Sequence, residues 1–257
     1  MRFSDVGTLA WSRRTGGKLS RLDRMELVKQ GVMLRLGQLP TRLQRRFGLT
    51  QPGIARLDWH RLRIPDSAIA REAEDVLRES SPVHLANHCH RTYLWGAVLA
   101  QHDALRYDEE LLYVSCLLHD LGLTEKFNKV EAGSHCFALD GAIAAESITR
   151  KHWDQVRCDS MAEAITLHLN PSVNVGYGTE AHLLNAGAGL DVAGARKWEV
   201  ARSTQDEVLQ HYPRANFKQA IDKSLRKEAT FRPCCRAHFL YDSLQFGELI
   251  KHASFSE

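Results

Sequence analysis

The sequence lacks the features that mark membrane-spanning, secreted or disulfide-rich proteins. No apolar run approaches the roughly 20 residues that cross a bilayer, and no apolar stretch with a small-residue cleavage site follows the N-terminus. The six cysteines include no C-x-x-C pair, so we expect reduced thiols rather than a disulfide framework. These absences favour a soluble, cytoplasmic protein that does not enter a membrane.

The overall charge is too small to indicate a partner. The 257 residues carry a net charge of +3. Residues 1–66 hold fourteen Lys and Arg against five Asp and Glu, a net charge of +9, which leaves −6 for the rest of the chain. Because this basic segment has few aromatic residues on which bases could stack, nucleic acid is disfavoured as a partner. Packing against the body, or contact within a homo-oligomer, is the expected role.

Strand signals are weak, whereas helix signals recur from Pro65 onward. No alternating run of β-branched residues is bounded by hairpin turns. Ser67 and Asp108 are typical N-caps, and the Ser160 to Glu163 segment resembles a capping box. The expected helices span about 24–36, 67–78, 84–102, 108–121, 140–151, 160–170, 179–189, 216–227 and 236–251.

These signals predict an all-α protein of three parts. Residues 1–64 form a less regular, basic N-terminal extension, residues 65–228 a helical domain, and residues 229–257 a C-terminal packing helix. The function of the extension is not legible from its composition.

The most informative segment is Leu117-Leu118-His119-Asp120-Leu121-Gly122, where an apolar helix ends in a histidine and a carboxylate. Burying both groups unpaired costs several kcal/mol, whereas a metal ion satisfies them together. Neighbours on a helix point about 100° apart, so both reach one ion only where the helix ends. The pair is therefore a candidate metal site, although a surface helix end with a solvated aspartate fits the same dipeptide.

Two further segments carry groups of the same chemistry. His88 shares a helix face with apolar residues, whereas His90 lies about 200° away, which favours His88 as the side chain that meets the His119 helix. A histidine on a helix is also common as an ordinary core or surface residue. Asp191 follows Gly187-Ala188-Gly189, small residues that permit close helix packing, and would be an unpaired buried charge unless a cation meets it.

The ordered set of His88-x-x-Arg91, Leu-Leu-His119-Asp120-Leu-Gly and Leu190-Asp191 resembles the HD superfamily of metal-dependent hydrolases. Over about residues 65–220 the chain is more closely similar to the cyanamide hydratase branch of that superfamily. The similar stretches are Asn87-His88 with Arg91-Thr92-Tyr93, Asp108-Glu109-Glu110-Leu111-Leu112-Tyr113, Phe137 with Asp140-Gly141-Ala142, Ala164-Ile165 with Leu167-His168, and Tyr212-Pro213-Arg214.

The resemblance implies an HD-domain helical bundle at residues 65–228 whose single divalent metal is bound by His88, His119, Asp120 and Asp191. Members with two metals carry a further histidine shortly before a Gly-Ala pair, but this chain has Ala138 there. A second metal is therefore disfavoured. The mixed nitrogen and oxygen ligands suit zinc or iron, and manganese is compatible with them.

Other residues are expected to handle the proton and the substrate. Asp120 or His168 would move the proton, and His168 is either a metal ligand or a neutral neighbour of the ligands. Arg91, Lys126 and His168 are candidate contacts of a small-molecule substrate. Arg91 could instead pair with a carboxylate and close its end of the site.

Three functions remain open on this reasoning. The closer resemblance implies that metal-activated water hydrates a small nitrile of the cyanamide type. The alternative is a phosphohydrolase that cleaves nucleotide mono- or diesters, which the lack of a Gly-rich phosphate loop disfavours. The third is a metabolite-binding scaffold without catalysis, which the retention of all four candidate ligands disfavours.

Overall fold

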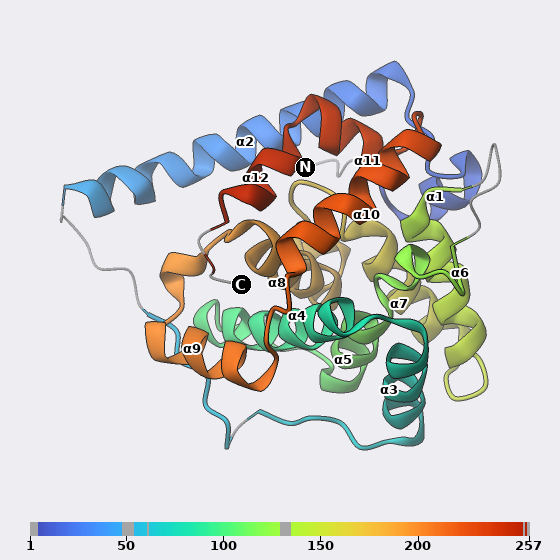
Figure 1. The fold of residues 1–257 in the computed structure, drawn as a ribbon, viewed down its shortest axis with the longest axis horizontal. Coiled ribbons are helices and arrows are strands. Elements are labelled where there is room, and N and C mark those ends of the chain that lie inside the picture. Colours follow the sequence, from blue (N-terminus) through green and yellow to red (C-terminus); the bar gives the residue numbers. More distant parts are fainter. Residues whose placement is uncertain (1–4, 48–53, 61, 129–134, 254, 256–257) are drawn as a thin grey trace.

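The computed structural model describes residues 5–47, 54–60, 62–128, 135–253 and 255, and helices are the regular secondary structure of these residues (Figure 1). Two isolated bridges are the only β-type pairing in the described ranges. The all-α prediction is thus confirmed. The helices are α1 (Leu9–Thr15), α2 (Arg21–Arg46), α3 (Ala68–Ser80), α4 (Val83–His102), α5 (Glu109–Leu118), α6 (Phe137–Thr149), α7 (Gln155–Leu167), α8 (Thr179–Ala193), α9 (Arg202–His211), α10 (Phe217–Phe231), α11 (Arg236–His238) and α12 (Phe246–Lys251).

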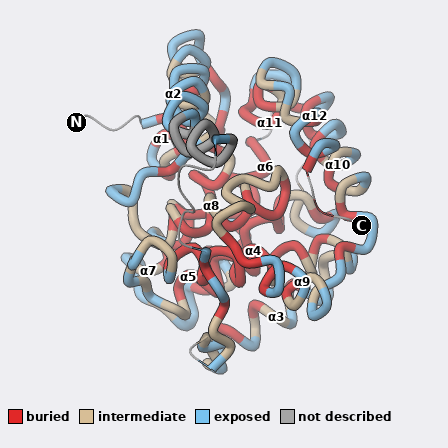
Figure 2. Tube along the Cα trace, turned by 90° about the vertical axis from the view of Figure 1, so that its left-hand side faces the viewer, coloured by how far each residue is buried: buried red, intermediate tan, exposed pale blue. Residues whose placement is uncertain are grey.

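Helix α4 lies at the centre, with α8 packed along one side and α5 along another. Figure 2 shows that the buried segments gather around α4, α5 and α8, while α2 is mainly exposed where it is described. Close packing depends on Gly187, because a Cβ there would lie 2.3 Å from the backbone oxygen of Thr92. The two backbones therefore approach more closely than any side chain would allow.

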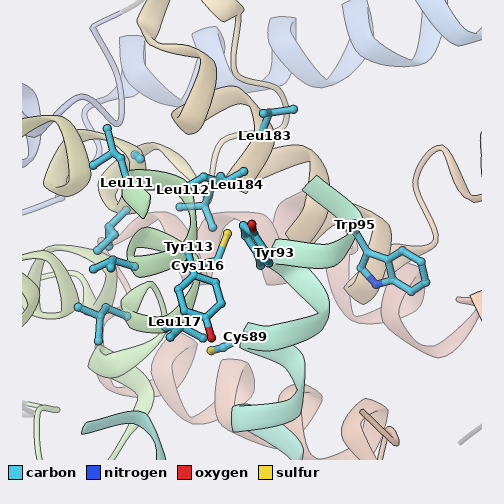
Figure 3. Packing of buried hydrophobic residues seen from close by; sticks show 14 of the residues in the cluster. Cys89, Tyr93, Trp95, Leu111, Leu112, Tyr113, Cys116, Leu117, Leu183 and Leu184 are labelled. Atoms are coloured by element: carbon cyan, nitrogen blue, oxygen red, sulfur yellow. The ribbon is translucent and has the colours of Figure 1, made fainter. Parts of the chain in front are cut away.

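The core between these helices is formed by aromatic, leucine and cysteine side chains (Figure 3). Tyr93 from α4 and Tyr113 from α5 meet edge to face, with ring centroids 4.9 Å apart. Leu112 and Leu117 of α5 are fully buried beside them. This packing fixes the angle between α4, which carries His88, and α5, which leads into His119 and Asp120.

Two of the predicted caps are confirmed and one is wrong. The Ser67 hydroxyl accepts from Ala70 N, and the Asp108 carboxylate accepts from Leu111 N. Helix α7 is capped instead by Asp154. Ser160 lies inside that helix, where its hydroxyl donates to a backbone carbonyl, because Asp154 offers the same chemistry one and a half turns earlier.

Helix α5 ends three residues before its expected last residue, Leu121. Its last residue is Leu118, and a 3-10 turn follows at Leu121–Leu123. The turn packs against α6 so closely that a Cβ at Gly122 would lie 1.9 Å from the carbonyl oxygen of Phe137. His119 and Asp120 therefore stand between two helical segments, where neighbouring side chains can point to one side.

The helices near both ends of the chain differ from those predicted. One or two short helices were expected in the first sixty residues. The structure has the short helix α1 and, around the predicted 24–36, the single 26-residue helix α2. The single helix expected at 236–251 is instead α11, a π-helical turn at Phe239–Ser243 and α12, with Gln245 at a φ of 53° between the last two. The division at residues 64 and 228 stays a prediction.

Segments from the first sixty residues pack on the body, as expected of the extension. The backbone N–H of Leu9 donates to the Glu163 carboxylate of α7, and Ala55 forms a bridge with Val200. Among the described residues, no helix combines the length and the apolar character that a bilayer crossing requires.

The α4–α8 contact can be tested with two glycines of the same helix. We expect Gly187→Ala to destabilise the protein by about 1–3 kcal/mol, because the new Cβ would clash with the backbone of α4. Gly189→Ala is the matched control, since its Cβ would make only an ordinary contact at 3.8 Å and alanine favours a helix by up to about 1 kcal/mol. Urea denaturation measures both. Equal stability of the two variants would contradict the close approach.

Candidate metal centre

Three histidines converge on the carboxylate of Asp120. His88 comes from the first half of α4, His119 from the end of α5 and His168 from the end of α7. The Nε2 atoms of His88 and His119 lie 3.6 and 3.3 Å from Asp120 Oδ2, and His168 Nε2 lies 3.6 Å from Oδ1. Residues far apart in sequence thus present their ring nitrogens to one buried oxygen pair.

Each of the three imidazoles is held through its other nitrogen. His119 Nδ1 lies 2.8 Å from the carbonyl oxygen of Cys116, and His168 Nδ1 contacts that of Ile165. His88 Nδ1 lies 2.7 Å from Asp191 Oδ2. Since the carbonyl and carboxylate oxygens only accept, each Nδ1 donates, and in the neutral ring each Nε2 presents its lone pair to Asp120. Metal-binding histidines are commonly oriented in this way.

The electrostatics of the cluster favour a positive charge between the histidine Nε2 atoms and the Asp120 carboxylate. Burial raises the pKa of Asp120, but the neighbouring His119, His168 and His88 outweigh this and hold it below its usual range. Burial lowers the pKa of His119, yet the charge of Asp120 outweighs it and raises that pKa well above normal. A lone pair and a carboxylate oxygen 3.3 Å apart repel unless a proton or a metal cation lies between them.

The donor set therefore fits a divalent metal. His88, His119 and Asp120 are all buried, and they offer one ligand atom each within 4.8 Å of one another. Two imidazole nitrogens and a carboxylate oxygen suit zinc, iron(II) or manganese. His168 approaches the opposite oxygen of Asp120, and burial lowers its pKa to about 3, so its ring is neutral.

Asp191 does not face this cluster but lies behind His88. Its Oδ2 accepts from His88 Nδ1, and both of its oxygens are bonded by Arg91, through Nε and Nη2 at 2.8 Å each. The indole N–H of Trp95 donates to Oδ1 at 2.9 Å. The cation that the sequence required beside Asp191 is thus a guanidinium. A role as metal ligand stays a prediction, and these contacts favour a role in positioning His88.

Arg91 is fully buried in this ion pair, the second of the two roles considered for it. Its remaining nitrogen, Nη1, donates to the carbonyl oxygens of Tyr212 and Pro213. The same stretch supplies Arg214, whose Nη1 donates to the backbone oxygen of Asp191. Residues 212–214 therefore close the site beside α4 and α8. This agrees with the sequence analysis, in which these three residues form one of the stretches similar to cyanamide hydratases.

Lys126, the other cation considered for substrate binding, lies at the surface. Its ammonium group is 4.0 Å from the Glu79 carboxylate and its side chain is about half exposed. Substrate binding by Lys126 stays a prediction. His102, Asp103 and Glu199 form a second group with metal-ligand chemistry, but Arg196 already pairs with both carboxylates there.

Two residues of the site were not identified from the sequence. Trp95 is four residues after Arg91 and seven after His88, so helical spacing would have put all three on one face of α4. Phe217, at the start of α10, stacks on the His88 ring with centroids 4.6 Å apart. No local sequence signal connects Phe217 with the site, since its position depends on the path of the chain after Arg214.

Known proteins of similar sequence are enzymes. Two proteins of Saccharomyces cerevisiae, named cyanamide hydratase DDI2 and cyanamide hydratase DDI3, are each 25% identical to this chain over 174 residues, which cover 66% of this chain and 76% of each relative. No family model matches the chain. The similarity confirms the resemblance to cyanamide hydratases and supports an enzyme of the hydratase or hydrolase type.

The Asp191–Arg91 ion pair can be tested through stability. We expect Asp191→Asn to cost about 3–5 kcal/mol, because it leaves a fully buried guanidinium without a charge partner. Asp66→Asn is the control: its ion pair with Arg71 is largely exposed, and we expect a loss of about 0–1 kcal/mol. The free energy of unfolding in denaturant distinguishes the two. A loss of about 0–1 kcal/mol in the free energy of unfolding for both variants would contradict the structural role of Asp191.

Metal binding can be tested by elemental analysis of purified variants. We expect the wild-type protein to retain close to one divalent ion per chain, and His119→Ala to lose most of it. His182→Ala is a matched control, because the His182 Nδ1 is also bonded to a backbone oxygen, that of Val173, but the residue is outside the cluster. Equal metal content in both variants would show that the cluster is not the binding site.

Proposed function

We propose that this chain is a metal-dependent hydratase of the HD superfamily that adds water to a small nitrile of the cyanamide type. The observation that carries the proposal is the set of three buried imidazoles, each fixed through Nδ1, whose Nε2 atoms face Asp120 at 3.3–3.6 Å. The similarity to two cyanamide hydratases supports the reaction class.

His88, His119 and Asp120 would hold the metal, and Asp191 would keep His88 in its binding orientation. A divalent ion there would make a water molecule acidic near neutral pH and would polarise the nitrile. The reaction adds the oxygen of water to the nitrile carbon and both of its hydrogens to the nitrile nitrogen, which gives an amide or, from cyanamide, urea. Every atom of water is thus retained in the product.

The proton must travel from the attacking water to the nitrile nitrogen. His168 Nε2 is suited to accept and return it, because burial keeps the ring neutral and Ile165 fixes its Nδ1 as the donor. Asp120 Oδ1, which lies 3.6 Å from that nitrogen, is the second candidate acceptor. Asn185 supports this arrangement, since its amide donates to the backbone oxygen of His168.

The surroundings favour a small, uncharged substrate over a nucleotide. His88 and His119 are 1% exposed and His168 is 8% exposed, so a small linear molecule would reach them far more easily than a phosphoester. Phe217 and Phe137 lie against His88 and His168, which makes the walls apolar. Arg91, the candidate substrate contact on α4, is committed to Asp191 and to the carbonyls of Tyr212 and Pro213, so its guanidinium is not available to a phosphate.

The two enzymatic functions are separated by parallel assays of the metal-loaded protein. We expect cyanamide to be converted to urea and a panel of nucleotide mono- and diesters to remain intact. His168→Asn should lower kcat on the order of 10²–10⁴-fold if His168 transfers the proton, with metal content unchanged. Activity on a phosphoester alone would overturn the proposal.

If the unaltered protein retains its metal but acts neither on cyanamide nor on the phosphoesters, the result would instead favour the metabolite-binding scaffold. His182→Ala serves as the control here too and should keep the activity of the unaltered protein. Its ring lies on α8 and its Nδ1 is bonded to Val173, outside the cluster.

A further inference from the structure

Helix α2 carries many of the exposed apolar side chains of the molecule. Among the described residues, eight large apolar side chains are exposed on α2, and the other nine are spread over the rest of the chain. The eight are Leu22, Met25, Val28, Val32, Met33, Leu34, Leu36 and Leu39. Single exposed apolar residues are ordinary, whereas a group of this size on one helix is typical of a surface that binds a partner.

One side of α2 is already packed on the body. Leu27 is fully buried and shares an apolar cluster with Phe239. Since neighbours on a helix point about 100° apart, Met25, Val32 and Leu36 point about 140–180° away from Leu27. Figure 1 shows α2 along one edge of the molecule. The helix therefore has a second apolar stripe, which faces outward and which the packing on the body leaves exposed.

The outward stripe has the spacing of a coiled-coil seam. Alternate steps of three and four residues separate its members, which is the spacing of the a and d positions in a seven-residue repeat. We call these residues the α2 seam: Leu22, Met25, Lys29, Val32, Leu36 and Leu39. Such a repeat keeps one row of side chains facing a second helix, whereas a lipid surface needs only a broad apolar face. The spacing therefore favours a helix as the partner.

The spacing of the α2 seam is the same from either end, so the seam can pair with a copy of itself. A two-fold axis through its middle would place Leu22 opposite Leu39 of the second copy and Met25 opposite Leu36 of the second copy. In every layer an a position of one helix then meets a d position of the other. An identical chain thus offers a complementary surface without any further element.

We propose that α2 pairs in antiparallel orientation with α2 of a second copy of this chain, through the α2 seam. Lys29 selects this orientation. In a parallel pair the two Lys29 ammonium groups would lie in one layer and repel, whereas in the antiparallel pair each lies opposite Val32 of the other copy. The ammonium group is 3.5 Å from Glu26 of its own helix, so its charge stays paired while its aliphatic stem covers Val32.

Apolar side chains also flank the α2 seam. Val28 and Met33 occupy the positions beside a seam that contact the second helix of a coiled coil. Together with Met25 and Val32 they line a shallow groove of about 420 Å³, to which Phe239 contributes from the body. Pairing would cover the seam and these flanks together. Because the contact is smaller than a standard interface of roughly 20–30 residues a side, the dimer should dissociate on dilution.

Sedimentation velocity of the full-length protein tests the pairing. We expect a species of twice the 29.1 kDa mass of one chain, whose share rises between about 1 µM and about 1 mM protein. Met25→Glu should raise the dissociation constant of the dimer about tenfold or more, because it buries a carboxylate against Leu36 of the second copy. Val156→Glu is the matched control, since Val156 is also largely exposed but lies on α7. A monomer at every concentration, or a dimer that Met25→Glu leaves intact, would contradict the pairing.

The orientation is tested by exchanging charges across the seam. Leu36→Lys alone should weaken the dimer as Met25→Glu does, and the two substitutions in one chain should restore it, because each new carboxylate then lies opposite a new ammonium group. In a parallel pair like charges would meet at both positions, so a double variant that associates no better than either single variant would refute the antiparallel seam. Met25 and Leu36 are 68% and 52% exposed in one chain, so the fold should be unaffected, which circular dichroism verifies.

Salt distinguishes a second copy from a membrane surface. Helix α2 carries seven Lys and Arg against two Asp and Glu, so two copies repel at long range and added sodium chloride should strengthen the dimer. Binding to vesicles that contain phosphatidylserine would instead weaken with salt. A protein that stays monomeric and sediments with such vesicles until salt releases it would rule out the dimer in favour of a lipid surface.

Discussion

The carboxylate of Asp191 is the group on which the organisation of the site depends. It is fully buried, and it joins the His88 ring, the Arg91 guanidinium and the Trp95 indole of α4 to α8. A carboxylate at this depth is tolerated only because cationic and N–H groups surround it. Those same contacts fix the tautomer and direction of His88. Charge compensation inside the core and orientation of the His88 ring toward Asp120 are therefore one and the same interaction.

The helices could largely be predicted from local chemistry, and their ends could not. The starts of two helices could be predicted at Ser67 and Asp108, because an N-cap interaction involves only three or four adjacent residues. The early end of α5 depends instead on the contact between Gly122 and the Phe137 backbone, which is invisible in either segment alone. The last helix is also broken at Gln245, whose positive φ no local pattern predicted. Periodicity carries no information about such contacts.

In the candidate site, too, some residues could be predicted from local sequence and others depend on tertiary contacts. His119 and Asp120 stood out because an apolar helix ended in two polar groups, and the structure brings them together with His88 and His168. The surroundings of Asp191 were harder to foresee, since its need for a cation was clear but the choice between a metal and Arg91 required three-dimensional contacts. Phe217 gave no signal, because stacking between a loop-proximal ring and a helix histidine has no sequence pattern.

The close approach at Gly187 has a consequence for how the molecule moves. Because the Thr92 backbone lies against that glycine and Arg91 pairs with Asp191, we expect α4 and α8 to move as one rigid block. Amide protons along this block should exchange with solvent last, by global unfolding alone. His168 is the most exposed of the three clustered histidines, at 8% against 1% for His88 and His119, so we expect small molecules to approach the cluster from its side.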